Sequence, residues 1–494
     1  MTVPAPQAEV AALLRRLTGA EPIETHISAV FVGSDEVLKL KKAVALGFLD
    51  FREPAARERF ARRELALNAP HAPGLYRDVV PVARAPDGTL ALGGEGEAVD
   101  WVLRMAPVPG GDFLDAVAAR GGLTPALLDG VADAVAAMHA ALPPAPVDPA
   151  DAPAAARAVL AGNRAAALRA GLPADRVGAL AAAAEGWIAR LSPLLRARAA
   201  EGRVRRCHGD LHLGNLCLWR GRPTPFDALE FDEALATVDT GYDLAFLLMD
   251  LDRRASRADA NRVLNRTVAR TGDAGLVGAL PLWLSLRALV RAHVQAARGE
   301  RDGLDYLAAA EAYLRPPPAR LVAVGGLQGT GKSTLARRLA PGLGAAPGAL
   351  VLRSDEIRKR RHGAAPEDRL PDRAYARAEG AAVFADLFAA AAGAAGAGHA
   401  VVADAAFLDP GDRAGVAAAA AAAGVPFTGL WLTAPLEVLR ARVAARRGDA
   451  SDATVPVLEA AAAALDAAGG PPGDWAGVDA AAADPLPVAL AALA

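Results

Sequence analysis

The spacing of apolar and polar positions changes twice along the chain. Residues 21–107 carry short apolar runs that alternate with turn residues, which predicts strands, and one charged segment, REPAARERFARRELALN, which predicts a helix. From residue 111 to 315 the apolar spacing is mostly helical, with one strand-and-loop block at 204–232. A small β-rich lobe followed by a larger helical lobe is therefore expected, an α+β arrangement of two lobes.

The last third of the chain alternates apolar runs with helical segments. The runs are LVAVGG, GALVLRS, HAVVADAAF and FTGLWL. Because strands that are joined by helices pair in parallel, this order predicts an α/β domain with a parallel sheet flanked by helices.

Three consecutive prolines in RPPPAR mark the clearest boundary, because they stop a preceding helix and form a stiff spacer. We predict a first domain over residues 1–315, with a small lobe over about 1–107 and a helical lobe over about 108–315. A proline linker at 316–319 and a second domain over 320–494 follow.

The composition excludes some functions. The chain of 494 residues has 54 Lys or Arg and 56 Asp or Glu, so it lacks the basic excess of proteins that bind nucleic acid polymers. Hydrophobic residues make up 53% and the mean hydropathy is +0.20, but much of this content is alanine. The uncharged stretch 414–436 is broken between Gly424 and Pro426, which favours a helix and a buried strand over a membrane span. We expect no membrane association.

The N-terminal segment MTVPAPQAEVAALLRRL lacks the basic start, the apolar block and the small-residue cleavage site of a secretion signal. Two cysteines are too few for a disulfide framework, which agrees with a reducing compartment. We therefore expect a cytoplasmic protein.

A glycine-rich motif, GLQGTGKST, lies between an apolar strand and a predicted helix. Its spacing is that of a phosphate-binding loop, whose glycines turn backbone N–H groups toward phosphate oxygens; the alternative is an ordinary glycine-rich turn. We expect Lys332 to neutralise the β- and γ-phosphates of ATP and Ser333 to ligate Mg²⁺. The predicted ATP contacts in this loop are Gly326, Gly329, Gly331, Lys332, Ser333 and Thr334.

Acidic residues follow the next two predicted strands. Asp355 and Arg358 lie three residues apart in SDEIRKR, so both project from the first turn of a helix toward the strand ends, where open sheets bind ligands. We predict that Asp355 accepts the proton of an attacking hydroxyl and that Arg358 binds an anionic group of the acceptor. Asp404, at the end of its strand, is predicted to organise Mg²⁺ through water. For both aspartates the alternative is helix capping.

The late segment LEVLRARVAARRGDASDAT places Arg440, Arg442, Arg446 and Arg447 along one helix. Arginines that close over phosphates suit a lid, and Arg442 and Arg446 are the predicted ATP contacts; the alternative is a solvated face. With these motifs, residues 320–494 resemble the small P-loop kinases of the nucleoside-monophosphate-kinase-like group, particularly the polynucleotide-kinase and zeta-toxin-like branch with its D-x-x-R element.

A second motif, CHGDLHLGNL, places Asp210 and Asn215 in the pattern H-x-D-x-x-x-x-N, and Asp227 follows in PFDALEF. Kinase-type catalysis needs an Asp that orients and deprotonates the acceptor hydroxyl, together with an Asn and a second Asp for Mg²⁺. We predict Asp210 as the catalytic residue and Asn215 and Asp227 as metal ligands. A zinc site is the competing interpretation, because Cys207, His208, His212 and Cys217 lie close together, but their spacing matches no standard zinc pattern.

The small lobe is expected to supply a lysine for ATP and a glutamate that holds it. Lys39 and Lys41 share one strand face in VLKLKK; we choose Lys39, with Glu64 as its helix partner, and keep Lys41 and Glu58 in reserve. The alternative is a solvated basic strand beside a surface helix. No glycine-rich loop of the protein-kinase type occurs in THISAVFVG. His139 is expected to pack within its helix rather than to act in catalysis.

The histidine and glycine before Asp210 resemble the catalytic loop of aminoglycoside phosphotransferases and choline kinases. Residues 1–315 resemble the aminoglycoside-phosphotransferase-like, kinase-fold family, and the whole chain resembles bacterial bifunctional phosphotransferase/ATP-binding proteins, in which this domain is fused to a P-loop kinase or AAA-type ATP-binding domain. The resemblance implies an ATP- and Mg²⁺-dependent phosphotransferase with two ATP sites and a small-molecule hydroxyl acceptor. The alternatives are one active kinase domain regulated by a non-catalytic nucleotide-binding domain, and a scaffold or toxin–antitoxin-like partner that binds ATP without turnover. Acidic residues near the metal motif, Glu230, Asp232 and Glu233, would favour a cationic acceptor if they were not solvated loop charges.

Overall fold

The computed structural model describes residues 2–46, 49–446 and 448–493 of the 494 residues. By their contacts these residues form two compact units, one of Met1–Val147 with Glu201–Leu247 and the other of Asp148–Ala200 with Leu248–Ala494. This grouping follows contacts rather than the position of the prolines, and the domain limits expected from the sequence stay a prediction.

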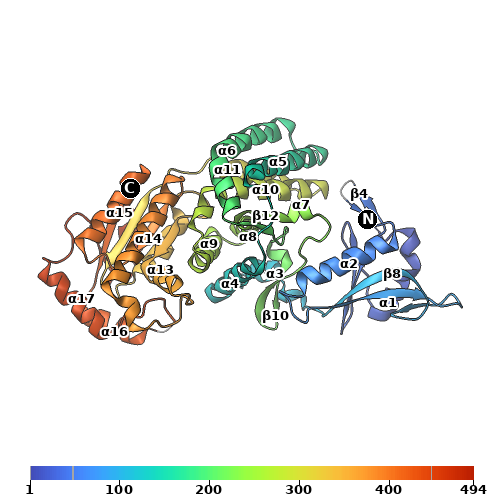
Figure 1. The fold of residues 1–494 in the computed structure, drawn as a ribbon, viewed down its shortest axis with the longest axis horizontal. Coiled ribbons are helices and arrows are strands. Elements are labelled where there is room, and N and C mark those ends of the chain that lie inside the picture. The colour runs from blue at the N-terminus through green and yellow to red at the C-terminus, as the bar shows by residue number, and fades with distance from the viewer. Residues whose placement is uncertain (1, 47–48, 447, 494) are drawn as a thin grey trace. The chain divides into compact units, whose positions relative to one another are not determined.

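A six-stranded antiparallel sheet begins the first unit, with the strand order β1-β2-β3-β8-β6-β7. Helices α1 and α2 cover its two faces (Figure 1). The alternation of apolar and charged side chains along β3 explains this arrangement, because Leu38 and Leu40 join the core beneath α1 while Lys39 and Lys41 face α2. The bounds are α1 Ala8–Thr18, β1 Ile23–Glu24, β2 Ser28–Val32, β3 Val37–Lys41, α2 Pro54–Asn68, β6 Tyr76–Arg84, β7 Leu90–Leu92 and β8 Glu97–Met105.

The rest of the first unit holds helices and, around the predicted strand-and-loop block, two pairs of short strands. β9 pairs with β12, and β10 pairs with β11, both antiparallel. The loop that carries Asp210 lies between β9 and β10. The bounds are α3 Leu114–Ala119, α4 Pro125–Ala141, β9 Val204–Arg206, β10 Leu216–Trp219, β11 Arg222–Pro225, α7 Glu233–Ala236, β12 Thr237–Asp239 and α8 Thr240–Arg254, whose second half continues into the second unit.

The second unit contains a five-stranded parallel sheet with the order β14-β15-β13-β16-β17. The four strands expected from the sequence are present, and β17 is a fifth at the edge. The predicted fold class, a bilobal kinase-like α+β region followed by an α/β P-loop region, is confirmed. The bounds are β13 Leu321–Gly326, α12 Lys332–Leu339, β14 Leu350–Arg353, α13 Ser354–Arg361, α14 Arg377–Gly396, β15 Val401–Asp404, α15 Pro410–Ala423, β16 Phe427–Thr433, α16 Leu436–Ala445, α17 Val455–Ala467, β17 Ala476–Asp479 and α18 Leu486–Ala491.

The uncharged stretch 414–436 forms most of α15 and all of β16, separated at Gly424, whose φ of 67° ends the helix. β16 lies inside the sheet between β13 and β17. Within the described residues, α14 is the one helix that is long and apolar enough to cross a membrane by length and composition. It packs against β14, β15 and α15 and buries Val383, Leu387 and Ala391.

Five helices from the middle of the chain complete the second unit, and one of them, α9, lies against the edge strand β14 (Figure 1). The Asn265 side chain accepts a hydrogen bond from Val351 N at 2.7 Å and donates one to Ala349 O at 3.3 Å. Asn261 donates to the same carbonyl at 3.0 Å. Two side chains thus satisfy backbone groups that a further strand would otherwise bind. The bounds are α5 Ala152–Arg169, α6 Ala174–Ala200, α9 Arg257–Thr271, α10 Leu280–Ala297 and α11 Gly303–Tyr313.

Candidate functional site

A buried cluster of charges lies between β3 and α2 in the first unit. Lys39 Nζ is 2.7 Å from Glu64 Oε1 and 2.6 Å from Asp227 Oδ1. Lys41 Nζ is 2.9 Å from Glu64 Oε2 and also binds Glu230. The reserve residue Glu58 lies elsewhere on α2, where it pairs with Arg62. The structure therefore brings Lys39, Glu64 and Asp227 together, as the sequence analysis expected of an ATP lysine, its helix partner and a metal ligand.

The electrostatics of this cluster favour its charged state. Burial by itself would lower the pKa of Lys39, but Asp227 and Glu64 outweigh it and hold that pKa well above its usual value. Burial would raise the pKa of Glu64, but Lys39 and Lys41 outweigh it and hold the pKa well below its usual range. Lys39 is therefore a fixed positive charge beside the partly exposed carboxylate of Asp227.

The catalytic-loop motif forms a turn in which Asn215 Nδ2 donates to Asp210 Oδ2 at 3.0 Å and to Asp210 O at 2.9 Å. The Asp210 carboxylate is 41% exposed, so it is accessible to an acceptor molecule. Asp227 has a φ of 60°, a conformation that Asp tolerates better than most residues, and its backbone N–H donates to the Tyr76 hydroxyl at 2.9 Å. Tyr76 is a part of this site that the sequence analysis missed.

Asp243 holds the backbone of the catalytic loop. Its carboxylate accepts the backbone N–H groups of His208, at 3.2 Å, and Gly209, at 2.8 Å, and lies 2.9 Å from His139 Nε2. His139 was expected only to pack within α4, and it is buried there, but it also fixes the carboxylate that positions the loop. The spacing of its neighbours gave no signal for this contact, because Asp243 lies more than a hundred residues further along the chain.

The zinc interpretation finds little support in the geometry. Among the described residues, the one group with metal-ligand spacing is His139, Cys207 and Asp243. Within it His139 and Asp243 bind each other, and Cys207 Sγ contacts Val238 O. Burial raises the pKa of the Cys217 thiol to about 12, which disfavours the thiolate that zinc requires.

The acidic residues after the metal motif are engaged within the protein. Glu230 binds Lys41, and Asp232 caps α7 through the backbone N–H groups of Ala234 and Leu235. Glu233 pairs with two arginines at 2.7 and 3.1 Å. Their arrangement therefore gives no support for a cationic acceptor.

The glycine-rich loop connects β13 to α12 in the second unit. Gly326 has a φ of 133°, and a Cβ there would lie 2.5 Å from Leu432 O. Gly329 and Gly331 also have positive φ values, of 84° and 83°. Lys332 Nζ donates to the carbonyl oxygens of Gly326 and Leu327, both at 2.9 Å, and burial lowers its pKa. The backbone of this loop therefore requires glycine at Gly326. The Lys332 side chain points toward the same loop, whereas Thr334 is exposed on α12.

Ser333 and Asp404 meet at the carboxyl edge of the sheet, where Ser333 Oγ donates to Asp404 Oδ2 at 2.5 Å. Arg353 Nε also donates to Asp404 Oδ2, at 3.2 Å. Burial raises the pKa of Asp355, despite the nearby guanidinium of Arg353. Asp404 does not cap a helix but contacts Ser333, which is predicted to ligate Mg²⁺. Arg353 also belongs to this site, and no sequence motif predicted it.

Arg358 lies over the Tyr375 ring, with its guanidinium carbon 5.0 Å from the ring centroid, and donates to Ala374 O at 2.8 Å. Its Nε is buried and has no hydrogen-bond partner within the described part of the chain. A buried donor without a partner is costly, so this arginine is suited to bind an anionic group.

Three of the four late arginines lie within the described residues, and each has different partners. Arg442 donates to Ala480 O at 3.1 Å and lies 3.5 Å from Gly329 O of the glycine-rich loop. Arg446 lies 3.8 Å from Asp449. Arg440 forms an exposed pair with Glu459, and Arg447 lies outside the described residues. Arg442 and Arg446 therefore remain the candidates for ATP contacts.

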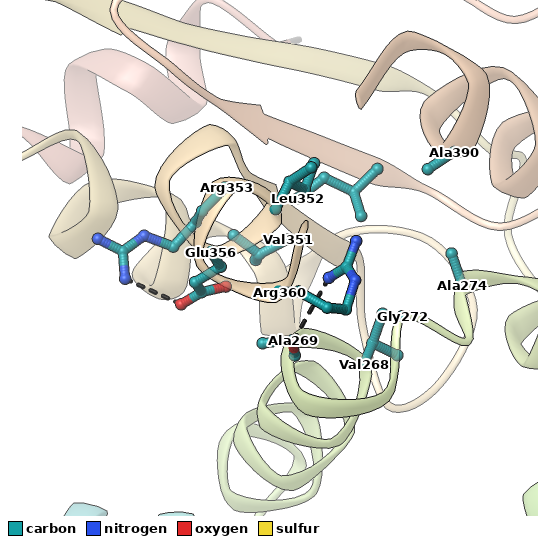
Figure 2. Close-up of a pocket in the computed structure, with 11 residues that line it drawn as sticks. Val268, Ala269, Gly272, Ala274, Val351, Leu352, Arg353, Glu356, Arg360 and Ala390 are labelled. Atoms are coloured by element: carbon teal, nitrogen blue, oxygen red, sulfur yellow. Dashed lines mark hydrogen bonds and ion pairs between the residues drawn. The ribbon is translucent and has the colours of Figure 1, made fainter. Parts of the chain in front are cut away.

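A small cavity of about 20 Å³ lies between α9 and the β14–α13 segment (Figure 2). Its lining is mostly apolar, and the side chains of Arg353, Glu356 and Arg360 also line it. This space could hold about one water molecule and is far too small for a nucleotide.

Comparison with known proteins assigns both regions. The model of the phosphotransferase enzyme family matches residues 28–270, and the model of an AAA domain matches residues 321–468. The chain joins a phosphotransferase-family region to an AAA-domain region. The predicted resemblance to a phosphotransferase domain fused to a P-loop or AAA-type domain is confirmed, and the two regions support ATP-dependent kinase activity of a phosphotransferase.

Relatives match this chain over most of its length. Uncharacterised proteins of Mycobacterium tuberculosis and Mycobacterium bovis are 29% identical over 455 residues, which cover 89% of this chain and 89% of theirs.

Several solved structures match part of this chain. A gluconokinase from Sinorhizobium meliloti is 23% identical, covers 36% of this chain and 91% of its own, and has a TM-score of 0.25. A choline kinase from Cryptosporidium parvum is 9% identical, covers 63% and 94%, and has a TM-score of 0.40. The aminoglycoside phosphotransferase APH(4)-Ia, in a ternary complex with ADP and hygromycin B, is 16% identical, covers 62% and 98%, and has a TM-score of 0.38.

Proposed function

We propose that this protein is an ATP- and Mg²⁺-dependent kinase with two nucleotide sites, each of which transfers a γ-phosphoryl group to a hydroxyl of a small molecule. One observation carries the proposal: in each site a partly buried lysine lies near a carboxylate that could hold Mg²⁺. Lys39 contacts Glu64 and Asp227, and Lys332 interacts electrostatically with Asp404, which binds Ser333.

In the first site, Asp210 would orient the acceptor hydroxyl and accept its proton, since its carboxylate is accessible and is held by Asn215. The amide nitrogen of Asn215 is used in that contact, which leaves its carbonyl oxygen for Mg²⁺. Asp227 supplies a second oxygen ligand, and Lys39, fixed by Glu64, would bind the ATP phosphates. Bound Mg²⁺ neutralises phosphate charge during the transfer.

In the second site, Lys332 would exchange its bonds to loop carbonyls for the phosphates, and Ser333 and Asp404 would hold Mg²⁺. Asp355 is the proposed base for the acceptor hydroxyl. Burial raises its pKa, which makes it a better proton acceptor than an exposed aspartate. Arg358, with its unpartnered Nε, would bind an anionic group of the acceptor.

The proposed acceptors are small molecules, and we propose a cytoplasmic protein that acts on neither nucleic acid polymers nor membranes. The nearly balanced charge of −2 supports the exclusion of a nucleic acid polymer. The second candidate function is a single active kinase region regulated by the other nucleotide-binding region. The lack of a protein-kinase-type glycine-rich loop before β3 makes the first region the candidate for the regulatory role.

Two separate substitutions test the proposal in the full chain. Asp210→Asn removes the proposed base of the first site, and Lys332→Ala removes the phosphate ligand of the second. The matched controls are Asp35→Asn, at an exposed turn, and Arg338→Ala, in an exposed pair on the same helix as Lys332. Each variant is assayed with γ-labelled ATP against sugars, aminoglycosides and nucleosides.

We expect Asp210→Asn and Lys332→Ala each to abolish transfer to a different set of acceptors, while the controls behave like the wild type. If neither substitution alters any transfer that the wild type performs, the proposal is wrong. If one substitution abolishes all transfer and the other changes only its rate, the regulated single-kinase function is correct instead.

A further inference from the structure

Arg353 occupies the centre of the second site, although no motif includes it. It is the last residue of β14, and the parallel register pairs it with Asp404, the last residue of β15. Both side chains therefore lie at the carboxyl edge of the sheet, next to Ser333. The Arg353 side chain is only 5% exposed, so its charge depends on protein partners rather than on water.

Three carboxylates surround this guanidinium, each through a different nitrogen. Nε donates to Asp404 at 3.2 Å, NH1 donates to Glu356 at 2.9 Å, and NH2 donates to Asp449 at 2.8 Å. Figure 2 shows the contact of Arg353 with Glu356. Because the guanidinium is planar and its donors are fixed in direction, a shift of one partner changes the geometry of the other two contacts.

The three partners come from different parts of the site. Asp404 is the proposed Mg²⁺ carboxylate, whereas Asp449 belongs to residues 448–454, which follow α16 and which we call the lid segment. The lid segment lies close in sequence to Arg446, one of the two arginines proposed to contact ATP. A single buried cation therefore binds both the metal carboxylate and the lid segment.

The lid segment has a second anchor that does not reach the metal site. Asp452 accepts hydrogen bonds from Lys359 Nζ at 2.6 Å and from Leu370 N at 3.0 Å, and it also binds the Tyr375 hydroxyl. Lys359 is buried on α13, and its ammonium group donates to Asp452 and to Asp368 O. Of the two anchors, the one through Arg353 also binds Asp404.

We propose that Arg353 is a positioning residue that couples closure of the lid segment to assembly of the Mg²⁺ site. With the lid segment closed, Asp449 shares the positive charge, and Arg353 holds Asp404 Oδ2 only through the longer contact of 3.2 Å, beside the 2.5 Å bond from Ser333. When Asp449 leaves, the buried guanidinium has two carboxylates instead of three, and it competes more strongly for Asp404. By linkage, Mg²⁺·ATP then favours the closed lid as much as the closed lid favours Mg²⁺·ATP.

This inference rests on the proposed function of the second site, and the test uses ATP itself as the probe. Binding of ATP to the full chain is measured by calorimetry with and without Mg²⁺, and the second site is the part of the binding that Lys332→Ala removes. The measured quantity is the factor by which Mg²⁺ strengthens that binding. Substitution of residues that support metal ligands lowers metal affinity about 10–100-fold.

We expect Arg353→Met and Asp449→Asn each to lower this Mg²⁺ factor by about tenfold or more. Arg353→Lys, which keeps the charge but not the three directed donors, should restore part of it. Asp452→Asn should weaken ATP binding by the same factor with and without Mg²⁺, because its anchor does not reach Asp404. The matched control is Arg337→Met, because Arg337 lies 3.9 Å from the same Glu356 but is half exposed; it should leave the factor unchanged.

Asp449 is one-third exposed, so Asp449→Asn carries the test even if Arg353→Met fails to fold. A Mg²⁺ factor in Asp449→Asn equal to that in Arg337→Met overturns the inference. An equal decrease of the Mg²⁺ factor in Asp449→Asn and Asp452→Asn also overturns the inference, since the lid segment would then act only by its position. If Lys332→Ala removes no ATP binding, the proposed function of the second site fails as well, which is a separate and recognisable result.

Discussion

Replacement of Lys41 by methionine should destabilise the small lobe strongly, although Lys41 is not the lysine proposed to bind ATP. Its side chain is 2% exposed, and its partners Glu64 and Glu230 are 0% and 6% exposed. Removal of one partner from a buried ion pair costs about 3–5 kcal/mol, because the remaining charge has neither water nor a counterion. Methionine has a similar volume, so no large cavity adds to this cost.

The response of the two glutamates sets the size of the effect. Burial already raises the pKa of Glu230, so this carboxylate takes up a proton when Lys41 is lost, which limits its own cost. Glu64 keeps Lys39 as a partner at 2.7 Å. We therefore expect the small lobe to lose stability near the lower end of this range, about 3 kcal/mol, which corresponds to a factor of about 150 in the equilibrium for local opening.

Hydrogen exchange followed by mass spectrometry measures this effect locally, in peptides that cover β3. We expect Lys41→Met to speed exchange there about 100-fold or more. The control is Arg15→Met, which removes one partner of an exposed pair with Glu21 and should change the stability by less than about 0.5 kcal/mol. Exchange in Lys41→Met within about threefold of the wild type would refute the buried-charge argument. If Lys41→Met abolishes ATP binding and Lys39→Met does not, the two lysines have been assigned in the wrong order.

Three further predictions concern other parts of the chain. Burial holds the pKa of His399 at about 4, against 6.5 in the unfolded chain, so the unfolded state takes up its proton first and stability falls as the pH drops from about 6.5 to about 4. In urea titrations, His399→Gln should lack about 3 kcal/mol of this loss of stability, and an unchanged loss would contradict the assignment. Gly429→Ala would place a Cβ 2.3 Å from the Trp475 ring and should lower the free energy of unfolding by about 1–3 kcal/mol. Thermal unfolding followed by tryptophan fluorescence measures this loss, and an unchanged midpoint would show that the ring can move. His139→Phe keeps the packing of α4 but removes the contact with Asp243. It should lower kcat of the first site about tenfold with little change in KM for ATP. A change in KM alone would contradict a role of His139 in positioning the loop.

The local motifs made much of both sites predictable. The glycine-rich loop and the H-x-D-x-x-x-x-N motif each lie within about ten residues, so spacing alone identifies Lys332, Ser333, Asp210 and Asn215. The alternation of β3 placed Lys39 and Lys41 on one face, but it could not separate them. The structure separates them, because Asp227, which is distant in sequence, forms its ion pair with Lys39.

The parts that could not be predicted depend on pairs distant in sequence. Arg353 and Asp449 are 96 residues apart, and His139 and Asp243 are 104 apart, so no local pattern relates them. The fifth strand of the sheet was missed for another reason. Its sequence AGVD is short and lies in an alanine-rich segment, where apolar periodicity is weak.

The contact of α9 with the edge of β14 has a consequence for how the chain can be divided. A fragment that begins at the prolines would lack Asn261 and Asn265, and it would leave Val351 N and Ala349 O without the partners that they have in the intact chain. An open strand edge of this kind is a template for pairing with another copy, so the isolated AAA-domain region should self-associate. A fragment intended to behave as an independent P-loop domain would need to begin before α9, inside the region that matches the phosphotransferase family.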